Sequence, residues 1–286
     1  MAGVPSRSGL PVTAIALFAP CVLLYTTLFI WPQALLLGTS FVDAGGVSAA
    51  NYRAVLADEY YWELLGRTFI LGAGVTVVTL VLGLPVAYVL ARMQSRWSAF
   101  LLLLTTFPML VSAVVRSFGW MVLFFRNGLI SQMLVMLGVS PRSSQLMYTL
   151  TGVVIALAQV LLPLMVLTLY GVFRSIDRDL EYAAMSLGAR PATALWLVTL
   201  RLARGGIIAG SLLVFALSIS TFATPSLVGG VRAGVMATAI FEQSIELLNW
   251  PLAATLATIL LVCVFAVAML YAGVMGREGG AASARA

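Results

Sequence analysis

Six stretches of this chain are dominated by apolar residues over more than 20 positions each, and they constrain its fold more than any other feature. A helix needs about 20 largely apolar residues to cross the hydrocarbon core of a membrane. A helix can lie there because it satisfies its own backbone hydrogen bonds. We therefore expect an all-α polytopic membrane protein with six transmembrane helices, at residues 12–37, 68–91, 99–125, 147–173, 206–229 and 252–275.

The composition supports a lipid environment. Of the 286 residues, 62% are hydrophobic and 9% are charged, whereas a soluble domain carries roughly a quarter charged residues. The first apolar run is longer than the core of a signal peptide and has no A-x-A cleavage site. We therefore expect it to remain as a transmembrane helix.

The positions of the arginines predict the orientation. Lysine and histidine are absent, so arginine provides all 16 basic side chains. Cytoplasmic segments are enriched in basic residues, and placing the N-terminus inside gives ten cytoplasmic arginines, five outer ones and one, Arg116, within a span. The cytoplasmic set is Arg7, Arg92, Arg96, Arg174, Arg178, Arg190, Arg201, Arg204, Arg277 and Arg285. Both termini are therefore predicted to face the cytoplasm.

The missing residue types exclude several chemistries. A phosphate-binding loop of the G-x-x-x-x-G-K-[ST] type needs a lysine, and an H-E-x-x-H zinc site or a Ser-His-Asp triad needs histidine. We therefore expect no catalytic residue, no metal site and no bound cofactor, and nothing indicates a nucleic-acid partner. A secondary transporter is a weaker alternative, because none of the ten acids falls within an expected span.

Three regions are expected along the chain. Residues 1–67 would form the N-terminal span and an outer loop containing a short surface helix, residues 68–275 the core, and residues 276–286 a disordered cytoplasmic tail. Prolines within the core spans predict kinks that neighbouring helices can accommodate. These are Pro85, Pro108, Pro163 and Pro225.

The charged interruption at 174–205 predicts two short helices joined by a sharp elbow. Asp177 is a suitable N-cap, and Asp179 and Glu181 favour a first helical turn. Gly188 can adopt the left-handed conformation that ends a helix, and Pro191 can begin the next one. An apolar stripe recurs at intervals of three or four, with Arg178, Glu181 and Met185 on other faces. Its members are Ile176, Leu180, Ala183, Ala184 and Leu187.

Periodicity leaves two interpretations of this elbow open. The Ala183–Ala184 pair allows another surface to approach the backbone closely, and Glu181 can find a basic partner at the rim. Alternatively, the segment is a solvated linker helix lying on the bilayer.

Polar residues within the spans are candidates for a solute pathway. Arg116 either lines the pathway or extends its guanidinium to the outer interface. Gln159, Ser218, Ser220 and Thr221 either form a polar layer or join helix to helix. Glu242 and Glu246, one turn apart in the last outer loop, either form an outer mouth or a solvated face.

The elbow also resembles a known family. The pattern E-x-A-A-x-x-x-G followed by I-x-A-G is similar to the cytoplasmic signature of inner-membrane permeases in bacterial binding-protein-dependent ABC importers. The residues that match it are Glu181, Ala183, Ala184, Gly188, Ile208 and Gly210. "FPMLVSAVVRSFGWMVLFFRNGLI" at 107–130, "TFATPSLVGG" at 221–230 and "NWPLAA" at 249–254 resemble the spermidine/putrescine-type subfamily.

The resemblance implies a type I ABC importer permease fold in the bacterial inner membrane. Its expected partners are an ATPase subunit dimer that carries ATP and Mg, a second permease subunit, an extracytoplasmic solute-binding protein and membrane lipid. The elbow would be the coupling helix that sits in a cleft of the ATPase. Its coupling residues would be Asp177, Leu180, Glu181, Ala183, Ala184, Leu187 and Gly188. The expected solute is a polyamine, with an amino acid, opine or phosphonate-like solute as the alternative.

Three positions depart from the family pattern. Arg201 and Gly205 stand where relatives usually have proline, and Arg190 stands where they commonly have serine. These differences predict that the second helix of the elbow is capped or oriented differently.

Overall fold

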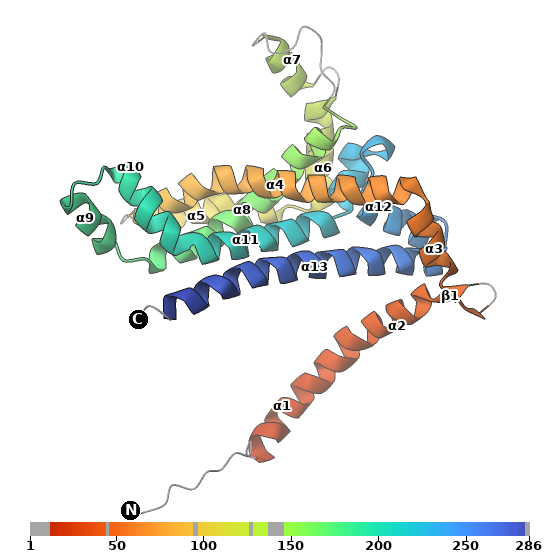
Figure 1. Ribbon diagram of the computed structural model, residues 1–286. Coiled ribbons are helices and arrows are strands. Elements are labelled where there is room, and N and C mark those ends of the chain that lie inside the picture. The colour runs from red at the N-terminus through yellow and green to blue at the C-terminus, as the bar shows by residue number, and fades with distance from the viewer. Residues whose placement is uncertain (1–11, 44–45, 94–96, 126–127, 137–145, 284–286) are drawn as a thin grey trace, which may run out of the picture.

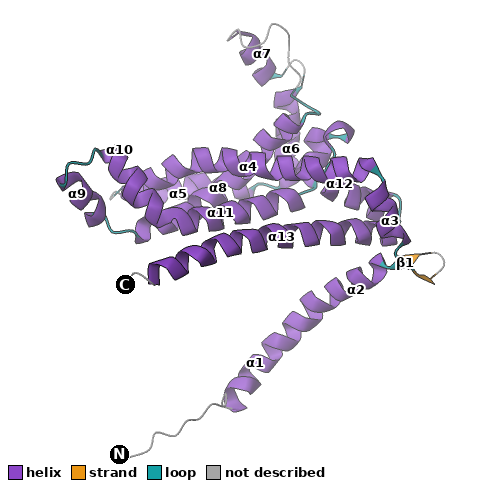
Figure 2. Ribbon diagram, in the orientation of Figure 1, coloured by secondary structure: helices purple, strands orange, loops and turns teal. Residues whose placement is uncertain are grey.

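The computed structural model describes residues 12–43, 46–93, 97–125, 128–136 and 146–283, and it is almost entirely helical (Figures 1 and 2). Within these residues, five helices are long and apolar enough to cross a membrane, and a sharply bent pair would make a sixth. The expectation of an all-α polytopic protein is therefore confirmed.

Three helices form the centre of the bundle: α4 (Glu59–Arg92), α8 (Leu150–Ser175) and α11 (Leu200–Ser220). Their facing side chains are buried, among them Leu71, Val75, Val153, Leu157 and Val214. Close packing in lipid depends on small residues that let helices approach. Gly206 of α11 is such a residue, because a Cβ there would stand 2.2 Å from Cγ2 of Val172 on α8.

The N-terminal span differs from the bundle because it lies apart from it. It consists of α1 (Val12–Tyr25), the π-helical η1 (Thr26–Ile30) and α2 (Trp31–Ser40), one continuous helical stretch that extends the expected span 12–37. It touches the bundle through the end of α2, where Thr255 Oγ1 donates to Ser40 O at 3.1 Å. From there it diverges (Figure 1), and most of its described side chains are exposed.

The expected span at 99–125 is not one straight helix. It consists of α5 (Trp97–Thr106), the 3-10 turn η2 (Phe107–Leu110) and α6 (Ala113–Phe124), with 91° between the two arms. Pro108 lacks an amide hydrogen, and Val111 and Ser112 are extended, so the helical hydrogen bonding is interrupted there. The predicted kink at Pro108 is therefore a full break, and α7 (Leu129–Met136) continues beyond it.

Several expected boundaries were wrong. Helix α4 begins at Glu59, so the division between residues 67 and 68 falls inside a helix, and Glu59 and Glu63 are exposed in its first turns. The span expected at 206–229 begins much earlier, because α10 (Pro191–Ala194), the π-helical η3 (Leu195–Thr199) and α11 form one continuous stretch that ends at Ser220. Helix α13 (Trp250–Ser283) continues through most of the tail expected to be disordered.

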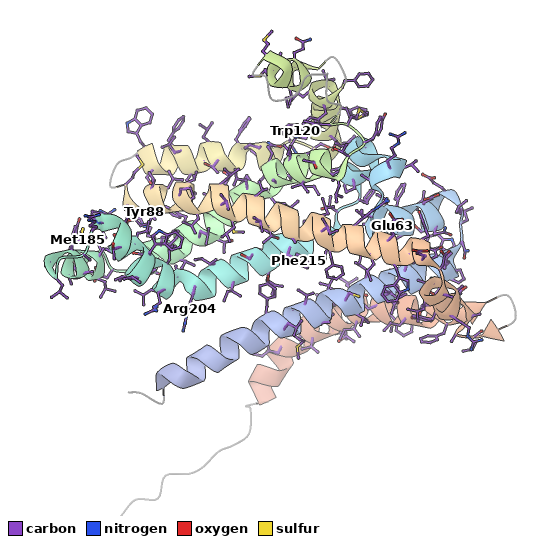
Figure 3. The ribbon with its side chains drawn as sticks, turned by 45° about the horizontal axis from the view of Figure 1, so that its top comes forward. Glu63, Tyr88, Trp120, Met185, Arg204 and Phe215 are labelled. Carbon is purple, nitrogen blue, oxygen red and sulfur yellow. The ribbon has the colours of Figure 1, made fainter. Side chains whose placement is uncertain are left out.

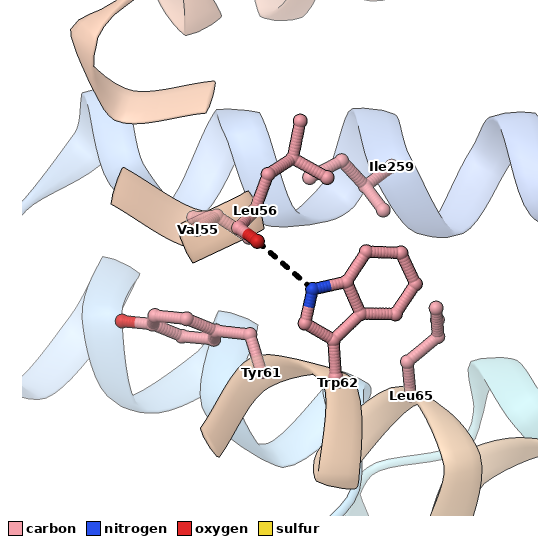
Figure 4. A pocket seen from close by; sticks show the side chains of 6 residues that line it. All are labelled: Val55, Leu56, Tyr61, Trp62, Leu65 and Ile259. Carbon is pink, nitrogen blue, oxygen red and sulfur yellow. Dashed lines mark hydrogen bonds between the residues drawn. The ribbon is translucent and has the colours of Figure 1, made fainter. Parts of the chain in front are cut away.

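The outer end of the bundle is built from short elements. They are β1 (Val42–Asp43) paired with β2 (Gly46–Val47), α3 (Ala50–Ala57), η4 (Pro225–Gly229), η5 (Val231–Ala233), α12 (Met236–Phe241) and η6 (Glu242–Glu246). The short helix expected in the first outer loop is α3, and it packs on α13 through buried Val55. Figure 4 shows a small apolar pocket there, beside which Trp62 Nε1 donates to Leu56 O at 3.0 Å.

The arrangement agrees with the orientation predicted from the arginines. The start of α1, the end of α13 and the elbow α9–α10 lie at one end of the molecule, while α3, α12 and the hairpin lie at the other (Figure 1). We refer to these ends as cytoplasmic and outer.

Candidate functional site

The first helix of the elbow, α9 (Asp179–Ser186), begins one residue later than expected. Arg178 occupies the N-cap position, so the assignment of Asp177 as N-cap was wrong by one residue. Asp177 still satisfies an amide of the first turn, because its Oδ1 accepts a hydrogen bond from Asp179 N at 3.0 Å. The acidic first turn therefore stabilises the start of α9 much as expected.

The end of α9 is fixed by Gly188, as the sequence predicts. Gly188 has φ +93°, its amide donates to Met185 O at 2.9 Å, and the Ala189 amide donates to Ala184 O at 3.1 Å. These two bonds form a Schellman motif, which turns the chain sharply after a helix. Pro191 then begins α10, with Arg190 as an N-cap that makes no side-chain capping bond. The elbow is confirmed.

Glu181 points into the protein, where three side chains hold its carboxylate. Oε1 accepts hydrogen bonds from Arg92 Nη2 and, at 2.7 Å, from Thr199 Oγ1, while Oε2 accepts from Tyr88 Oη at 3.0 Å. The side chains of Arg92 and Glu181 are 14% and 13% exposed. A basic partner was expected, but at the rim. The observed partner, Arg92, instead lies inside the protein, and Glu181 is largely buried against it. Together with Tyr88 and Thr199, this pair forms a clamp.

The electrostatics of this clamp favour the ionised carboxylate. Burial by itself raises the pKa of Glu181, but hydrogen bonds from Thr199, Arg92 and Tyr88 and the charge of Arg92 outweigh it, so the pKa lies below its usual value. Arg92 Nη1 also donates to Ile176 O at 3.0 Å. The clamp thus joins the end of α4, the segment after α8, helix α9 and η3 into one unit.

The opposite side of α9 presents apolar side chains to the outside. Leu187 is 90% exposed, Tyr182 is 56% exposed and Leu180 is 47% exposed. Ala183 is exposed and Ala184 is half-buried. Figure 1 shows the elbow projecting beyond the ends of α4, α8 and α11. An exposed apolar projection of this kind can bind another protein, and it can equally lie on the bilayer.

Sequence reasoning missed the clamp partners. Tyr88 and Arg92 lie about 90 positions before Glu181, and Thr199 lies 18 after it. The available signal was the only glutamate in a cytoplasmic segment rich in arginine, because a buried carboxylate needs a partner. Choosing among ten cytoplasmic arginines required the helix arrangement.

Arg116 lies beside the break in the bent span. Its Nη1 donates to Pro108 O, and its Nε is buried without a partner among the described residues. The side chain is therefore turned back onto the break. The neighbouring residue Ser117 is buried, and its Oγ lies 3.2 Å from Oγ1 of Thr224. This hydrogen bond joins α6 to the residue that caps η4.

The structure does not gather the other pathway candidates at one point. Gln159 Oε1 accepts from Trp120 Nε1 at 3.4 Å, a contact between α8 and α6. The hydroxyls of Ser218, Ser220 and Thr221 each donate to a carbonyl of their own helix, at 2.8, 3.1 and 2.8 Å. Ser218 is fully buried and Ser220 is exposed, so these neighbours face different surroundings.

Glu242 and Glu246 line a pocket of about 300 Å³ at the outer end, together with Tyr60 and Gly230. Both carboxylates come from the π-helical η6 and are exposed. The structure therefore places the expected outer-mouth residues on one concave surface, which a cationic group could enter.

Known proteins resemble this chain in sequence and fold. A family model for the binding-protein-dependent transport system inner membrane component matches residues 79–273. The spermidine/putrescine transport system permease protein PotB of Escherichia coli (strain K12) is 31% identical over 80% of this chain and 86% of its own length. The molybdenum transport system permease protein ModB of Mycobacterium tuberculosis (strain ATCC 25618 / H37Rv) is 36% identical over 70% of this chain and 74% of its own length.

Among solved structures, a bacterial ABC transporter involved in the import of the acidic polysaccharide alginate superposes with a TM-score of 0.76, covering 93% of this chain and 96% of that chain. A bacterial alginate ABC transporter in complex with an alginate pentasaccharide-bound periplasmic protein superposes with a TM-score of 0.75, covering 91% of this chain and 92% of that chain. Both are 14% identical, so these likenesses show the shared fold.

Proposed function

Because this chain belongs to the binding-protein-dependent transport system inner membrane components, we propose that it conducts a polyamine such as spermidine or putrescine and that a separate ATPase powers it through the elbow. It is a multi-pass permease subunit of a bacterial ABC importer with the type I fold, located in the inner membrane. The chain is a transport subunit and not an enzyme.

The observation that carries the coupling proposal is the contrast between the two faces of α9. One face is fixed to the bundle through Glu181 and Arg92. The other exposes Leu180, Tyr182 and Leu187. A lever needs both a firm attachment and a free contact surface. An ATPase dimer that binds the free face would move the cytoplasmic ends of the spanning helices when ATP draws its halves together.

Under this proposal the pathway forms between this chain and a second, similar permease. A solute-binding protein delivers the solute at the outer end, where Glu242 and Glu246 line their pocket. ATP and Mg are bound by the ATPase. ATP binding opens the permease outward, and hydrolysis resets it.

The similarity to PotB over most of both chains and the acidic outer pocket support a polyamine. A second candidate is a solute that carries a negatively charged group, such as an amino acid, opine or phosphonate-like compound. ModB, a molybdenum transport permease, is similar at 36% identity, and Arg116 lies in a spanning segment, which favours a negative charge nearby.

Uptake of radiolabelled putrescine and spermidine would decide between them. Cells lacking the gene should lose ATP-dependent polyamine uptake and regain it with the intact chain. Unchanged polyamine uptake, together with loss of an anionic solute, would support the second candidate.

The coupling proposal has its own test. Leu187→Arg should release the ATPase subunit during co-purification, because it places a charge in the apolar contact. Val47→Arg is the matched control, since Val47 is also 90% exposed but lies in β2 at the outer end. Equal ATPase recovery with both variants would contradict docking through this face of α9.

A further inference from the structure

The cytoplasmic end of the bundle carries a polar pocket that the transport proposal does not use. It has a volume of about 500 Å³ and is lined by Arg92 and Met93 at the end of α4, and by Arg174, Asp177 and Arg178 at and after the end of α8. Three arginines and one carboxylate thus share one concavity, so its charge is positive on balance.

The individual contacts leave this positive charge largely available. Glu181 neutralises Arg92 from the side of the clamp. Arg174 interacts with a neutral group, because its Nη1 donates to Tyr170 Oη at 2.9 Å and its guanidinium carbon lies 5.9 Å from the centre of that ring. Asp177 uses one oxygen on the amide of Asp179. Arg174 and Arg178 therefore supply the excess charge.

Helix dipoles account for part of this arrangement. Arg92 and Arg174 stand in the last turns of α4 and α8, where cations are favourable. Arg178 stands at the N-cap of α9, where a positive charge is unfavourable. Its presence there needs another reason, and an anionic ligand in the pocket provides one.

An apolar groove adjoins this pocket. It has a volume of about 400 Å³ and runs between α4 and α5, lined by Pro85, Val86, Val89, Leu101 and Leu104 among others. Met93 lines both the groove and the polar pocket. Val89 and Leu104 are 56% and 55% exposed, so both helices bring exposed apolar side chains to the groove.

We propose that the pocket and groove together bind one anionic glycerophospholipid of the cytoplasmic leaflet. The phosphate would lie among Arg92, Arg174 and Arg178, because guanidinium groups match phosphate oxygens geometrically. An acyl chain would pass Met93 and lie in the groove between α4 and α5. Basic pockets between helices at the cytoplasmic side of a membrane suit anionic lipid headgroups, and the adjoining groove distinguishes this ligand from a free anion.

The headgroup can be tested by titrating the purified full-length chain in a non-ionic detergent with dioleoyl phosphatidylglycerol or dioleoyl phosphatidylcholine, counting bound lipids by native mass spectrometry. Phosphatidylglycerol should bind more tightly. Arg174→Gln and Arg178→Gln should each weaken it about fivefold. Arg201→Gln is the control, since Arg201 is exposed at the cytoplasmic start of α11 and lines neither pocket nor groove. Equal binding of both lipids, or equal losses in all variants, would overturn the proposal.

The acyl chain has a separate test. Val89→Trp should fill the groove and reduce phosphatidylglycerol binding. Val77→Trp on the same helix, at 58% exposure and outside the groove, should not. Inorganic phosphate in large excess should fail to displace the lipid. Displacement by phosphate would mean that the pocket binds a free anion. Disulfide crosslinking in native membranes, under an added oxidant, of Val89→Cys to a cysteine introduced into a second permease, with lipid excluded, would mean that a subunit covers the groove. These readouts are independent of the transported solute.

Discussion

Two arginines of the spanning helices, Arg92 and Arg116, have very different surroundings. Both have an Nε buried without a partner among the described residues. Arg92 nevertheless pairs with Glu181, donates to Ile176 O and lies 5.6 Å from the ring centre of Tyr88. Among the described residues, the Arg116 guanidinium makes one hydrogen bond, to Pro108 O in the broken span.

This difference shows where charged contacts hold separate elements of the permease together. A charge compensated by an opposite charge and several hydrogen bonds fixes the geometry of everything it joins. A charge held by one carbonyl beside a broken helix fixes little. The Arg92–Glu181 pair therefore ties the elbow to the end of α4 and to the segment after α8, whereas no ion pair is found at the 91° bend among the described residues.

The largest expected effect comes from Glu181→Ala. Removing one partner of a buried ion pair leaves the other charge uncompensated, and we expect a loss of about 3 kcal/mol in stability, measured as a lower midpoint of thermal unfolding in detergent. ATP-driven uptake should fall with it. Glu63→Ala is the control, because the Glu63–Arg67 pair is exposed at the outer end, away from Tyr88 and Met185 (Figure 3), where such pairs contribute little. Similar midpoint shifts would remove the contrast between the two arginines.

Acidification should weaken the Arg92–Glu181 contact as well, with a smaller loss of stability than Glu181→Ala. Because the folded pKa of Glu181 lies below the ordinary value of 4.5, its ionised form stabilises the fold above that pH, and this contribution is lost as the pH falls through the folded pKa. The protonated carboxyl keeps its packing, so the loss should be smaller than in Glu181→Ala. Thermal midpoints between pH 6 and pH 3 should decline less in Glu181→Gln than in the wild type. If the midpoints of both proteins fall equally with pH, the loss of stability comes from other carboxylates and not from Glu181.

The sequence predicted the elbow itself better than the contacts that join the elbow to the bundle. The Ala183–Ala184 pair, Gly188 and Pro191 specify the elbow within 15 residues, because helix ends depend on neighbouring residues. The clamp joins Arg92 and Glu181 across 89 positions, and local patterns carry no information about such pairs. Apolar runs predicted the long apolar helices but not their ends, since α4 and α10–α11 extend beyond the membrane-length stretch into polar sequence.

The broken span shows a second limit. Pro108 indicated a kink, yet the 91° turn also includes the non-helical residues Val111 and Ser112, and Ser117 beyond it contacts Thr224, the residue before η4. The same holds for Ser218, Ser220 and Thr221, which looked like a polar layer in sequence. Each hydroxyl bonds to its own helix, as serine and threonine commonly do.

A smaller effect on stability is expected from Gly188→Val. A β-branched residue at φ +93° is strained by about 1–2 kcal/mol, but the surroundings are open, since a Cβ there would meet nothing within 4 Å. The strain should be relieved by reorienting α9 relative to α10. We therefore expect uptake and ATPase co-purification to fall sharply while the unfolding midpoint moves by a few degrees. Gly188→Asn should preserve most uptake, because asparagine tolerates positive φ. Equal loss in both variants would contradict a role for the backbone conformation.

The smallest effect on stability is expected from Arg116→Ala. The substitution removes one hydrogen bond to Pro108 O, but it also removes the cost of holding a guanidinium in a spanning segment, about 2.5–3.5 kcal/mol on insertion scales. These terms oppose each other, so the unfolding midpoint should change by the equivalent of about 1 kcal/mol or less.

Uptake kinetics should nevertheless change, because Arg116 brings a positive charge to the break between α5 and α6. For a polyamine, removal of that charge should lower the KM for uptake, whereas for an anionic solute it should raise the KM. Arg116→Lys is the matched variant, since it keeps the charge but loses the planar geometry. If both variants transport like the wild type while the chain remains assembled, the guanidinium stabilises the break alone. In that case the contrast with Arg92 concerns folding and not transport.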